Sequence, residues 1–253
     1  MKDEYLVAIT YIQDGAQGNE LALSIEGWRK HFKEEFRVVV FGDKPTVEGV
    51  EWVPMERVPG KDGEYRPALD VNTKLKAICL YCRERGIPGF IWAADDYFAV
   101  NDFTIRDIML PVYADDELPS KWDKSQNDYW HEQIKTRRLC EREGFETVNW
   151  STHLPKWFDD ILLLQIIEDY DLTETGYIIE NIYSNKYTTR APRTKLSKDK
   201  DRFKFPVWYP ELDREGFQNA LKNKIWVCCS VHGWSEELEN ELRKHYEQCH
   251  LTK

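Results

Sequence analysis

The sequence predicts an α/β fold in which a mainly parallel mixed sheet is flanked by helices, with a helical extension at the C-terminus. Short apolar runs rich in β-branched residues alternate with longer amphipathic stretches over the first 100 residues, and each run ends in a polar loop or turn. Such alternation is typical of parallel sheets. The length of 253 residues suits one domain, and the 42% apolar content excludes general disorder.

The first half predicts four strands and two helices. Asn19 is a candidate N-cap for the first helix, which would bury Leu21, Ile25 and Trp28 on one face. The run GFIWAA is short, apolar throughout and followed at once by two aspartates, which indicates a buried strand. The expected strands are residues 5–12, 37–41, 50–55 and 89–94, and the expected helices are residues 19–33 and 70–85.

The second half is less regular. Amphipathic or apolar patterns predict further helices, a late apolar run predicts a strand, and Ser235 is a candidate N-cap for a final surface helix. We found no internal repeat and no linker, so a single domain with a C-terminal extension is expected. The expected helices are residues 126–143, 156–170, 173–185 and 235–249, and the expected strand is residues 224–231.

Net charge and composition exclude some classes of binding partner and of cellular location. A net charge of −10 argues against a nucleic-acid-binding protein, because phosphate backbones bind to basic surfaces. No apolar stretch approaches the roughly 20 residues of a membrane span. An acidic N-terminus unlike a signal peptide and six scattered cysteines favour the cytoplasm. Residues 186–204 differ, with eight cations against two carboxylates. They are either a solvated loop or a flap that closes over a phosphorylated ligand.

Asp95 and Asp96 are the most informative pair, because they follow the buried strand directly. Ligands of open α/β sheets bind outside the carboxyl ends of strands. Two adjacent carboxylates cannot both be buried and ionised without a cation or hydrogen-bond donors. A hard divalent ion such as Mg²⁺ or Mn²⁺ would satisfy them, and would offset the charge of a leaving nucleoside diphosphate. The alternative is that the two aspartates only cap a turn.

Four stretches, in this order, resemble a known family. They are residues 19–26 with 37–40, residues 91–98 (IWAADDYF), residues 153–155 (HLP) with the helix after them, and residues 224–231 with the polar turn and acidic helix that follow. The chain resembles glycosyltransferases of the GT-A fold and, within that class, is similar to the Stealth family of sugar-phosphate transferases. The resemblance implies a nucleotide-binding half, residues 1–115, and an acceptor half, residues 116–253.

The chain departs from the family in three respects. The family's N-terminal signature block is not evident. His232 and Gly233 stand where the Stealth pattern has an Asn-Asp pair, and Asp95-Asp96-Tyr97 is not a strict Asp-x-Asp. We therefore expect a metal-dependent glycosyl transfer from a nucleotide-sugar donor to a glycan or another hydroxyl-bearing acceptor, as in polysaccharide biosynthesis. Transfer of a sugar 1-phosphate is the second hypothesis. A catalytically silent glycan-binding or assembly protein of the same fold is the third.

The resemblance also implies roles for individual residues. The loop after the first strand would hold the nucleoside, the second helix and the loop before it would approach the pyrophosphate, and the double aspartate would hold the metal. Asp43 is equally explained by its turn, and Lys74 and Lys76 cannot both face a ligand because they are two residues apart on a helix. The expected donor-binding residues are Thr10, Asp14, Asn19, Asp43, Arg66, Asn72, Lys74 and Asp95, and the expected metal ligands are Asp95, Asp96 and His232.

Asp96, His153 and Asp160 are the candidate catalytic residues. His153 and His232 are the histidines in non-helical contexts, and each could ligate a metal or act as a general base, although a lone histidine is more often structural. Asp160, with Asp159, is a candidate base for an acceptor hydroxyl. The simpler alternative is that both are acids of a helical first turn, where the macrodipole favours them.

Overall fold

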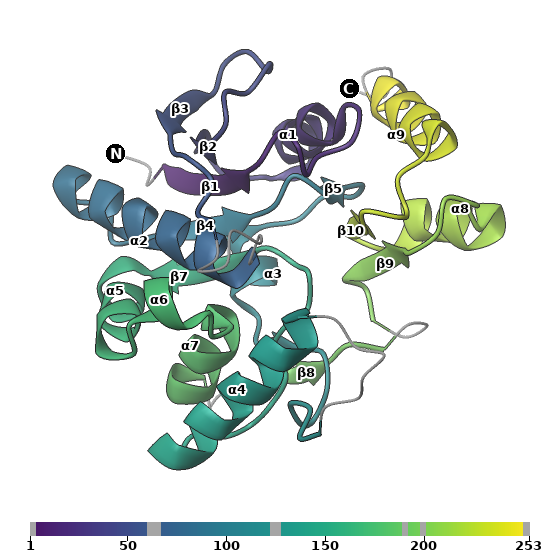
Figure 1. The fold of residues 1–253 in the computed structure, drawn as a ribbon. Coiled ribbons are helices and arrows are strands. Elements are labelled where there is room, and N and C mark those ends of the chain that lie inside the picture. Colours follow the sequence, from purple (N-terminus) through teal and green to yellow (C-terminus); the bar gives the residue numbers. More distant parts are fainter. Residues whose placement is uncertain (1–3, 60–66, 122–127, 189–191, 198–200, 250–253) are drawn as a thin grey trace.

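The computed structural model describes residues 4–59, 67–121, 128–188, 192–197 and 201–249. A five-stranded sheet in the order β3-β2-β1-β4-β7 forms the centre of the molecule (Figure 1). Its first four strands are parallel and β7 is antiparallel to β4. The predicted fold class is therefore confirmed. The strands are β1 (Tyr5–Tyr11), β2 (Phe36–Gly42), β3 (Glu51–Pro54), β4 (Gly89–Ala93) and β7 (Lys156–Asp159).

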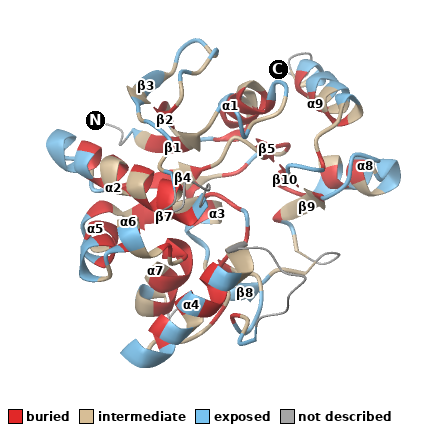
Figure 2. Ribbon diagram, in the orientation of Figure 1, coloured by how far each residue is buried: buried red, intermediate tan, exposed pale blue. Residues whose placement is uncertain are grey.

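Helices cover both faces of this sheet, because its strands are apolar on both sides. In β1, Val7 and Ile9 face α1 (Glu20–His31), whereas Leu6 and Ala8 face α2 (Pro67–Arg85) and α5 (Asp160–Asp169). Successive side chains of a strand point to opposite faces, so one strand contributes to two cores. Leu21, Ile25 and Trp28 of α1 are buried as predicted. Figure 2 shows the buried residues concentrated along the sheet and the inner faces of the helices.

A second, smaller sheet follows the first. It has the order β5-β10-β9, formed by β5 (Tyr97–Ala99), β9 (Lys204–Val207) and β10 (Trp226–Cys229). A third core of residues such as Phe98, Phe217 and Leu242 packs α8 (Arg214–Asn223) and α9 (Glu236–Gln248) against it. Ser235 caps α9 as expected, since its side chain accepts a hydrogen bond from the amide of Leu238. The chain thus returns at its end to the segment that follows β4.

α4, α7 and β8 extend the molecule below α2 and α5 in the view of Figure 1. β6 and β8 form a two-stranded pair, and α4 and α7 pack on one another. In the described part of the chain, no helix combines the length and the apolar content needed to cross a lipid bilayer. The remaining elements are α3 (Ile105–Met109), β6 (Val112–Tyr113), α4 (Asp128–Glu143), α6 (Leu172–Thr175), α7 (Ile179–Tyr187) and β8 (Thr194–Lys195).

Two predicted helices are wrong in part. Residues 156–159 form the edge strand β7 instead of the first turn of a helix, and Asp159 then caps α5 by accepting the amide of Leu162 at 2.9 Å. Residues 173–185 form two helices, because Gly176 adopts a left-handed conformation, φ 71°, between them. In both cases a local breaker or a neighbouring strand overrides the helical pattern.

Candidate functional site

The order of the strands marks where a ligand would bind. The chain passes from β1 to β2 and β3 on one side, then crosses through α2 to β4 on the other side of β1. The carboxyl ends of β1 and β4 therefore border the topological switch point, which is where ligands of open α/β sheets bind. Asp95 and Asp96 lie there, in the turn between β4 and β5.

The backbone of this turn is fixed from two sides. The hydroxyl of Ser24, on α1, donates to the carbonyl of Tyr97 at 2.9 Å and lies 3.3 Å from the carbonyl of Ala94. The amide of Cys229, at the end of β10, donates to the carbonyl of Asp96 at 3.1 Å. The backbone of the turn is thus held between the first helix and the last strand.

Three carboxylates at this point have raised pKa values, those of Asp95, Asp96 and Glu20. Burial raises the pKa of Asp95 to about 6 and that of Glu20, the first residue of α1, to about 7, with a further contribution from Asp95. Burial and the charges of Asp95 and Glu20 raise the pKa of Asp96 well above its usual range. The Oδ1 atom of Asp96 is buried, and no described residue hydrogen-bonds it. Within the described ranges, neither aspartate forms an ion pair. A buried carboxylate oxygen without a hydrogen-bond donor is stabilised by a bound cation or by protonation of the carboxylate.

The charge of a lysine on β9 acts on this region. The positive charge of Lys204, on β9, acts on both Asp96 and His153, and its ammonium donates to the carbonyl of Thr152 at 2.6 Å. Burial, with the charges of Lys204 and Lys156, lowers the pKa of His153 to about 4. His153 is therefore a neutral imidazole near pH 7. Its φ of 50° is left-handed, which is uncommon for a residue with a side chain.

A second set of polar side chains lies where β1 and β2 end. Asp43 follows β2, and its carboxylate accepts the amide of Gln13 at 2.8 Å, which holds the loop after β1. Gly42, φ 135°, allows this close approach, since a Cβ there would lie only 1.9 Å from the carbonyl oxygen of Tyr11. Burial, then the charges of Asp95, Asp43 and Glu20, raise the pKa of Tyr11. Thr10 accepts the indole N–H of Trp92 at 3.2 Å.

The loop of residues 13–19 is docked on the C-terminal part of the chain. Gln17 donates through its side chain to the carbonyl of Val231, next to the exposed His232. Asn19 donates to Glu239 of α9 at 2.6 Å and makes no capping hydrogen bond to α1. These contacts fasten the loop, which includes the exposed Asp14, to α9 and to the segment that carries His232. Among the described residues, His232 does not close with Asp95 and Asp96 into a group of three metal-ligating side chains.

Two predicted donor-binding residues on α2 make structural contacts. Asn72 is buried and donates to the carbonyls of Leu172 and Tyr177, so it anchors the segment around α6. Lys74 is 1% exposed and its ammonium pairs with Asp70, one turn earlier on α2. The described contacts of both side chains are therefore structural ones. Arg66 lies outside the described residues.

Asp160 is also separated from the group. β7 runs antiparallel to β4, and Asp159 pairs with Gly89, the first residue of β4. Asp160 therefore lies beside the start of β4, whereas Asp95 follows its end. Burial raises the pKa of Asp160, and the adjacent charge of Asp159 adds to it. The structure does not bring this carboxylate to the double aspartate.

The basic segment is anchored wherever the structure describes it. Arg193 pairs with Glu146, and Lys195 lies 2.8 Å from a carboxylate oxygen of Asp115 and also pairs with Asp116. Arg202 pairs with Asp107 at 2.9 Å. The positive charge of Lys204 also acts on Asp96. Arg190, Lys198 and Lys200 lie outside the described residues.

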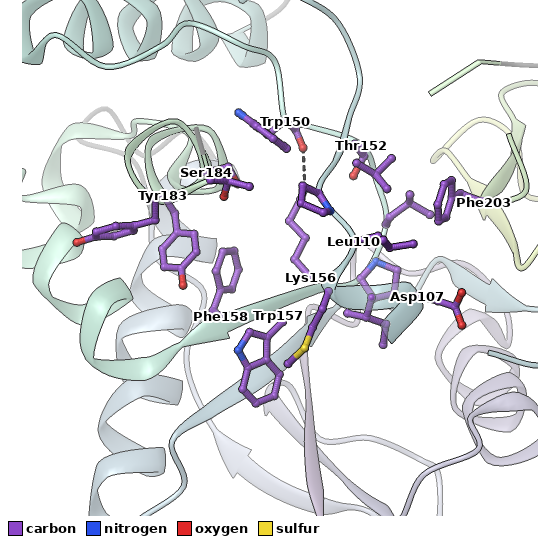
Figure 3. Close-up of a pocket in the computed structure, with 18 of the residues that line it drawn as sticks. Asp107, Leu110, Trp150, Thr152, Lys156, Trp157, Phe158, Tyr183, Ser184 and Phe203 are labelled. Carbon is purple, nitrogen blue, oxygen red and sulfur yellow. Dashed lines mark hydrogen bonds between the residues drawn. The ribbon is translucent and has the colours of Figure 1, made fainter. Parts of the chain in front are cut away.

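A separate cavity of about 480 Å³ lies along β7 (Figure 3). Most of its walls are apolar, and Met109 and Leu110 at its border are 48% and 47% exposed. One wall is the segment from Trp150 to Lys156, which also carries His153. Lys156 donates to the carbonyl of Trp150 at 2.7 Å, the contact dashed in Figure 3, and its ammonium lies 3.5 Å from Glu180.

Sequence reasoning missed Glu20, Tyr11 and Lys204 as individual site residues. Glu20 carried a usable signal, because the start of the helix after the first strand of a βαβ unit is a common ligand position. Lys204 carried none beyond membership of a basic segment. It is more than 100 residues from Asp96 in sequence, and only the pairing of β9 with β10, and of β10 with β5, brings it near.

No family model matches the sequence, and no curated protein is detectably similar to it. Among solved structures, the chain is similar to the crystal structure of a glycosyltransferase involved in the glycosylation of the major capsid of PBCV-1. The superposition covers 97% of this chain and 100% of that chain, with a TM-score of 0.43 and 10% sequence identity. At that identity the likeness concerns the course of the backbone and not the chemistry of the site.

Proposed function

We propose that this protein is a metal-dependent glycosyltransferase that uses a nucleotide-sugar donor. The observation that carries the proposal is the buried, unpartnered Oδ1 of Asp96, adjacent to Asp95 at the carboxyl end of β4. A buried carboxylate without a donor needs a reason to be there, and a cation shared with a diphosphate supplies one.

The donor set fits Mg²⁺ or Mn²⁺. These hard ions prefer carboxylate oxygens and bind through one or two of them together with substrate phosphates. Asp95 and Asp96 would hold the ion, and Glu20 would add negative charge beside them. When bound, the ion would offset the charge that develops on the leaving nucleoside diphosphate.

Different residues would then bind different parts of the donor and the acceptor. The loop of residues 13–19, with Asp43 and Tyr11, would hold the base and ribose at the end of β1. Lys204 would donate a hydrogen bond to the diphosphate. Such a charge-assisted hydrogen bond is stronger than one between neutral groups. His153, neutral near pH 7, would accept the proton of an acceptor hydroxyl. The acceptor is a glycan or another hydroxyl-bearing molecule.

Calorimetry tests the donor site. UDP, GDP and CDP are titrated into the protein with and without Mn²⁺. We expect one of them to bind in the presence of Mn²⁺ and to bind at least about tenfold more weakly without it. If none binds under either condition, a catalytically silent glycan-binding protein of this fold becomes the better hypothesis.

Transfer of a sugar 1-phosphate is the second candidate. It is favoured by the convergence of the four Stealth-like stretches: Glu20, Asp96, His153 and Cys228 lie in one group, with the Cys228 thiol 3.1 Å from the carbonyl of His153. The by-product separates the two reactions. Glycosyl transfer releases a nucleoside diphosphate, whereas sugar-phosphate transfer releases a nucleoside monophosphate and leaves a phosphodiester in the product.

A further inference from the structure

A second polar cluster lies at the far end of α1, outside the group around Asp96. His31 ends α1, and His245 and Cys249 lie one turn apart at the end of α9. A ring nitrogen of each histidine and the sulfur of Cys249 lie within 4.8 Å of one another. Among the described residues, these form the one group of three metal-ligating side chains that close together. The two imidazoles stack with their centroids 5.8 Å apart.

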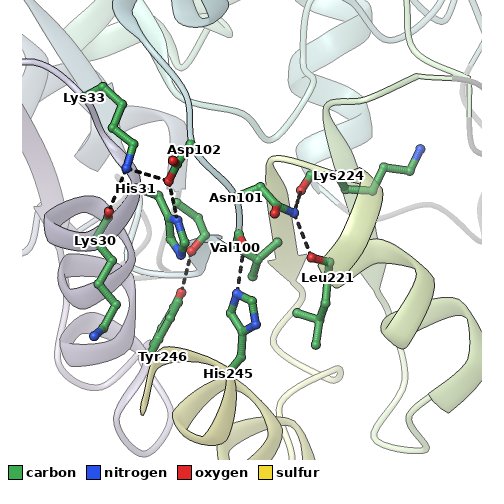
Figure 4. A network of polar contacts seen from close by, with 11 residues as sticks. Lys30, His31, Lys33, Val100, Asn101, Asp102, Leu221, Lys224, His245 and Tyr246 are labelled. Carbon is green, nitrogen blue, oxygen red and sulfur yellow. Dashed lines mark hydrogen bonds and ion pairs between the residues drawn. The ribbon is translucent and has the colours of Figure 1, made fainter. Parts of the chain in front are cut away.

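Hydrogen bonds fix which nitrogens are left over. Nδ1 of His31 lies 3.1 Å from a carboxylate oxygen of Asp102, and Nε2 of His245 lies 2.8 Å from the carbonyl of Val100 (Figure 4). When each of these nitrogens carries the ring proton, Nε2 of His31 and Nδ1 of His245 present lone pairs. A histidine that ligates a metal almost always donates its other N–H to a carboxylate or a carbonyl in this way.

The lone pair of His31 has no other use in the structure. His31 is 6% exposed, and no described residue hydrogen-bonds its Nε2. A buried, unpartnered imidazole nitrogen beside a thiol is an unusual arrangement for a purely structural histidine. It is the arrangement that a nitrogen- and sulfur-binding metal requires.

We propose that His31, His245 and Cys249 bind one zinc ion that fastens α9 to α1. Zinc accepts imidazole and thiolate ligands in tetrahedral sites, and three protein ligands leave the fourth position for water. Mg²⁺ and Mn²⁺ prefer oxygen, so the site is chemically distinct from the double aspartate. His31 and its partner Asp102 also line a cavity of about 450 Å³.

The zinc ion would act as a cross-link between distant parts of the chain. His31 and Cys249 are more than 200 residues apart in sequence, and an ion that binds only the folded chain stabilises it. Glu20, at the start of α1, belongs to the donor site, and the 12 residues of the helix span roughly 18 Å. The cross-link therefore lies outside the donor site and does not depend on the proposed function.

Cobalt substitution tests the site, because Co²⁺ bound to a thiolate gives a sulfur-to-metal charge-transfer band that oxygen ligands cannot give. Co²⁺ and then Zn²⁺ are titrated into the native protein under reducing conditions. We expect one equivalent of Co²⁺ to produce the band, Zn²⁺ to remove it, and Zn²⁺ to raise the melting temperature. The Asp96→Asn variant should keep the band, which separates this site from the donor site.

Variants make the result specific. Cys249→Ser should abolish the charge-transfer band, and His31→Gln and His245→Gln should weaken Zn²⁺ binding at least about tenfold. His131→Gln, an exposed histidine of α4, is the matched control and should change nothing. Asp102→Asn keeps all three ligands but changes the hydrogen bond to His31, and it should weaken Zn²⁺ binding roughly 10- to 100-fold. This variant still tests the site if a variant of one of the three ligands fails to fold. Native-like Zn²⁺ affinity in both Cys249→Ser and Asp102→Asn, or no band in the native protein, would overturn the proposal.

Discussion

The amide of Cys229 donates to the carbonyl of Asp96 at 3.1 Å, which joins the end of β10 to the turn after β4. The contact spans more than 130 residues of sequence. It holds the backbone of Asp96 while the side-chain Oδ1 stays buried and without a described partner. The chain therefore positions a carboxylate that the fold itself does not use, and this relationship leads to the first prediction.

Asp96→Asn should separate binding from stability. Removing one carboxylate should weaken Mn²⁺-dependent nucleotide binding at least about tenfold. The metal-free variant should be more stable to urea than the native protein. A neutral amide does not carry the cost of burying a negative charge, which is the cost that raises the pKa of Asp96. Calorimetry and urea denaturation measure the two effects. Glu215→Gln, on the exposed surface of α8, is the control that should change neither; unchanged nucleotide affinity in Asp96→Asn would contradict the donor site.

The metal-free protein should lose stability as the pH rises from about 4.5 to about 7. Glu20 has its pKa raised from 4.5 to about 7 in the folded state, so the native protein holds a proton that the unfolded chain releases in this window. Protons bound in excess by the native state make the free energy of unfolding fall as the pH rises. The loss attributable to Glu20 should amount to up to about 3 kcal/mol.

Glu20→Gln isolates this contribution. The glutamine cannot titrate, yet its oxygen can still accept the amide of Gln17, which Glu20 accepts at 2.6 Å. Urea unfolding of both proteins at pH 5 and pH 7.5, in the presence of a chelator, should show a smaller loss in the variant. If both proteins lose the same free energy of unfolding between the two pH values, the pKa of Glu20 is not raised by folding.

Lys204 should matter for the donor, and Lys195 should not, although both belong to the basic segment. Lys204 acts on Asp96, whereas Lys195 is occupied by Asp115 and Asp116. Lys204→Met should weaken nucleoside diphosphate binding roughly tenfold or more, the usual loss for one charge-assisted hydrogen bond. Lys195→Met should leave it within about twofold. Equal losses in the two variants, measured by calorimetry at one salt concentration, would instead indicate a non-specific effect of net charge.

Lys74 should be a stability residue. Its ammonium and the carboxylate of Asp70 are each 1% exposed, and the same carboxylate accepts the amide of Val58 at 2.9 Å. Lys74→Met leaves a buried carboxylate without its cation and should cost about 3–5 kcal/mol of unfolding free energy. The double variant Lys74→Met/Asp70→Asn should recover part of that loss. If Lys74→Met keeps its stability but loses nucleotide affinity, the lysine is a donor contact after all.

Much of the donor half could be predicted from the sequence. The strand β1, the helix α1 with its buried Leu21 and Trp28, and the strand β4 all follow from local periodicity and turn residues, which act over fewer than 20 positions. The placement of Asp95 and Asp96 at a carboxyl end of the sheet follows from the same local pattern, because the aspartates adjoin the strand directly.

The tertiary structure decided which charges meet. Residues 156–159 became the strand β7 because β4 offers a free edge, and that pairing carried Asp160 away from the double aspartate. Asp70 turned Lys74 inward, and the pairing of β9 with β10 brought Lys204 to Asp96. Local preferences are worth tenths of a kcal/mol per residue, whereas burial of a charge or an apolar surface is worth several, so contacts between distant segments determine these positions.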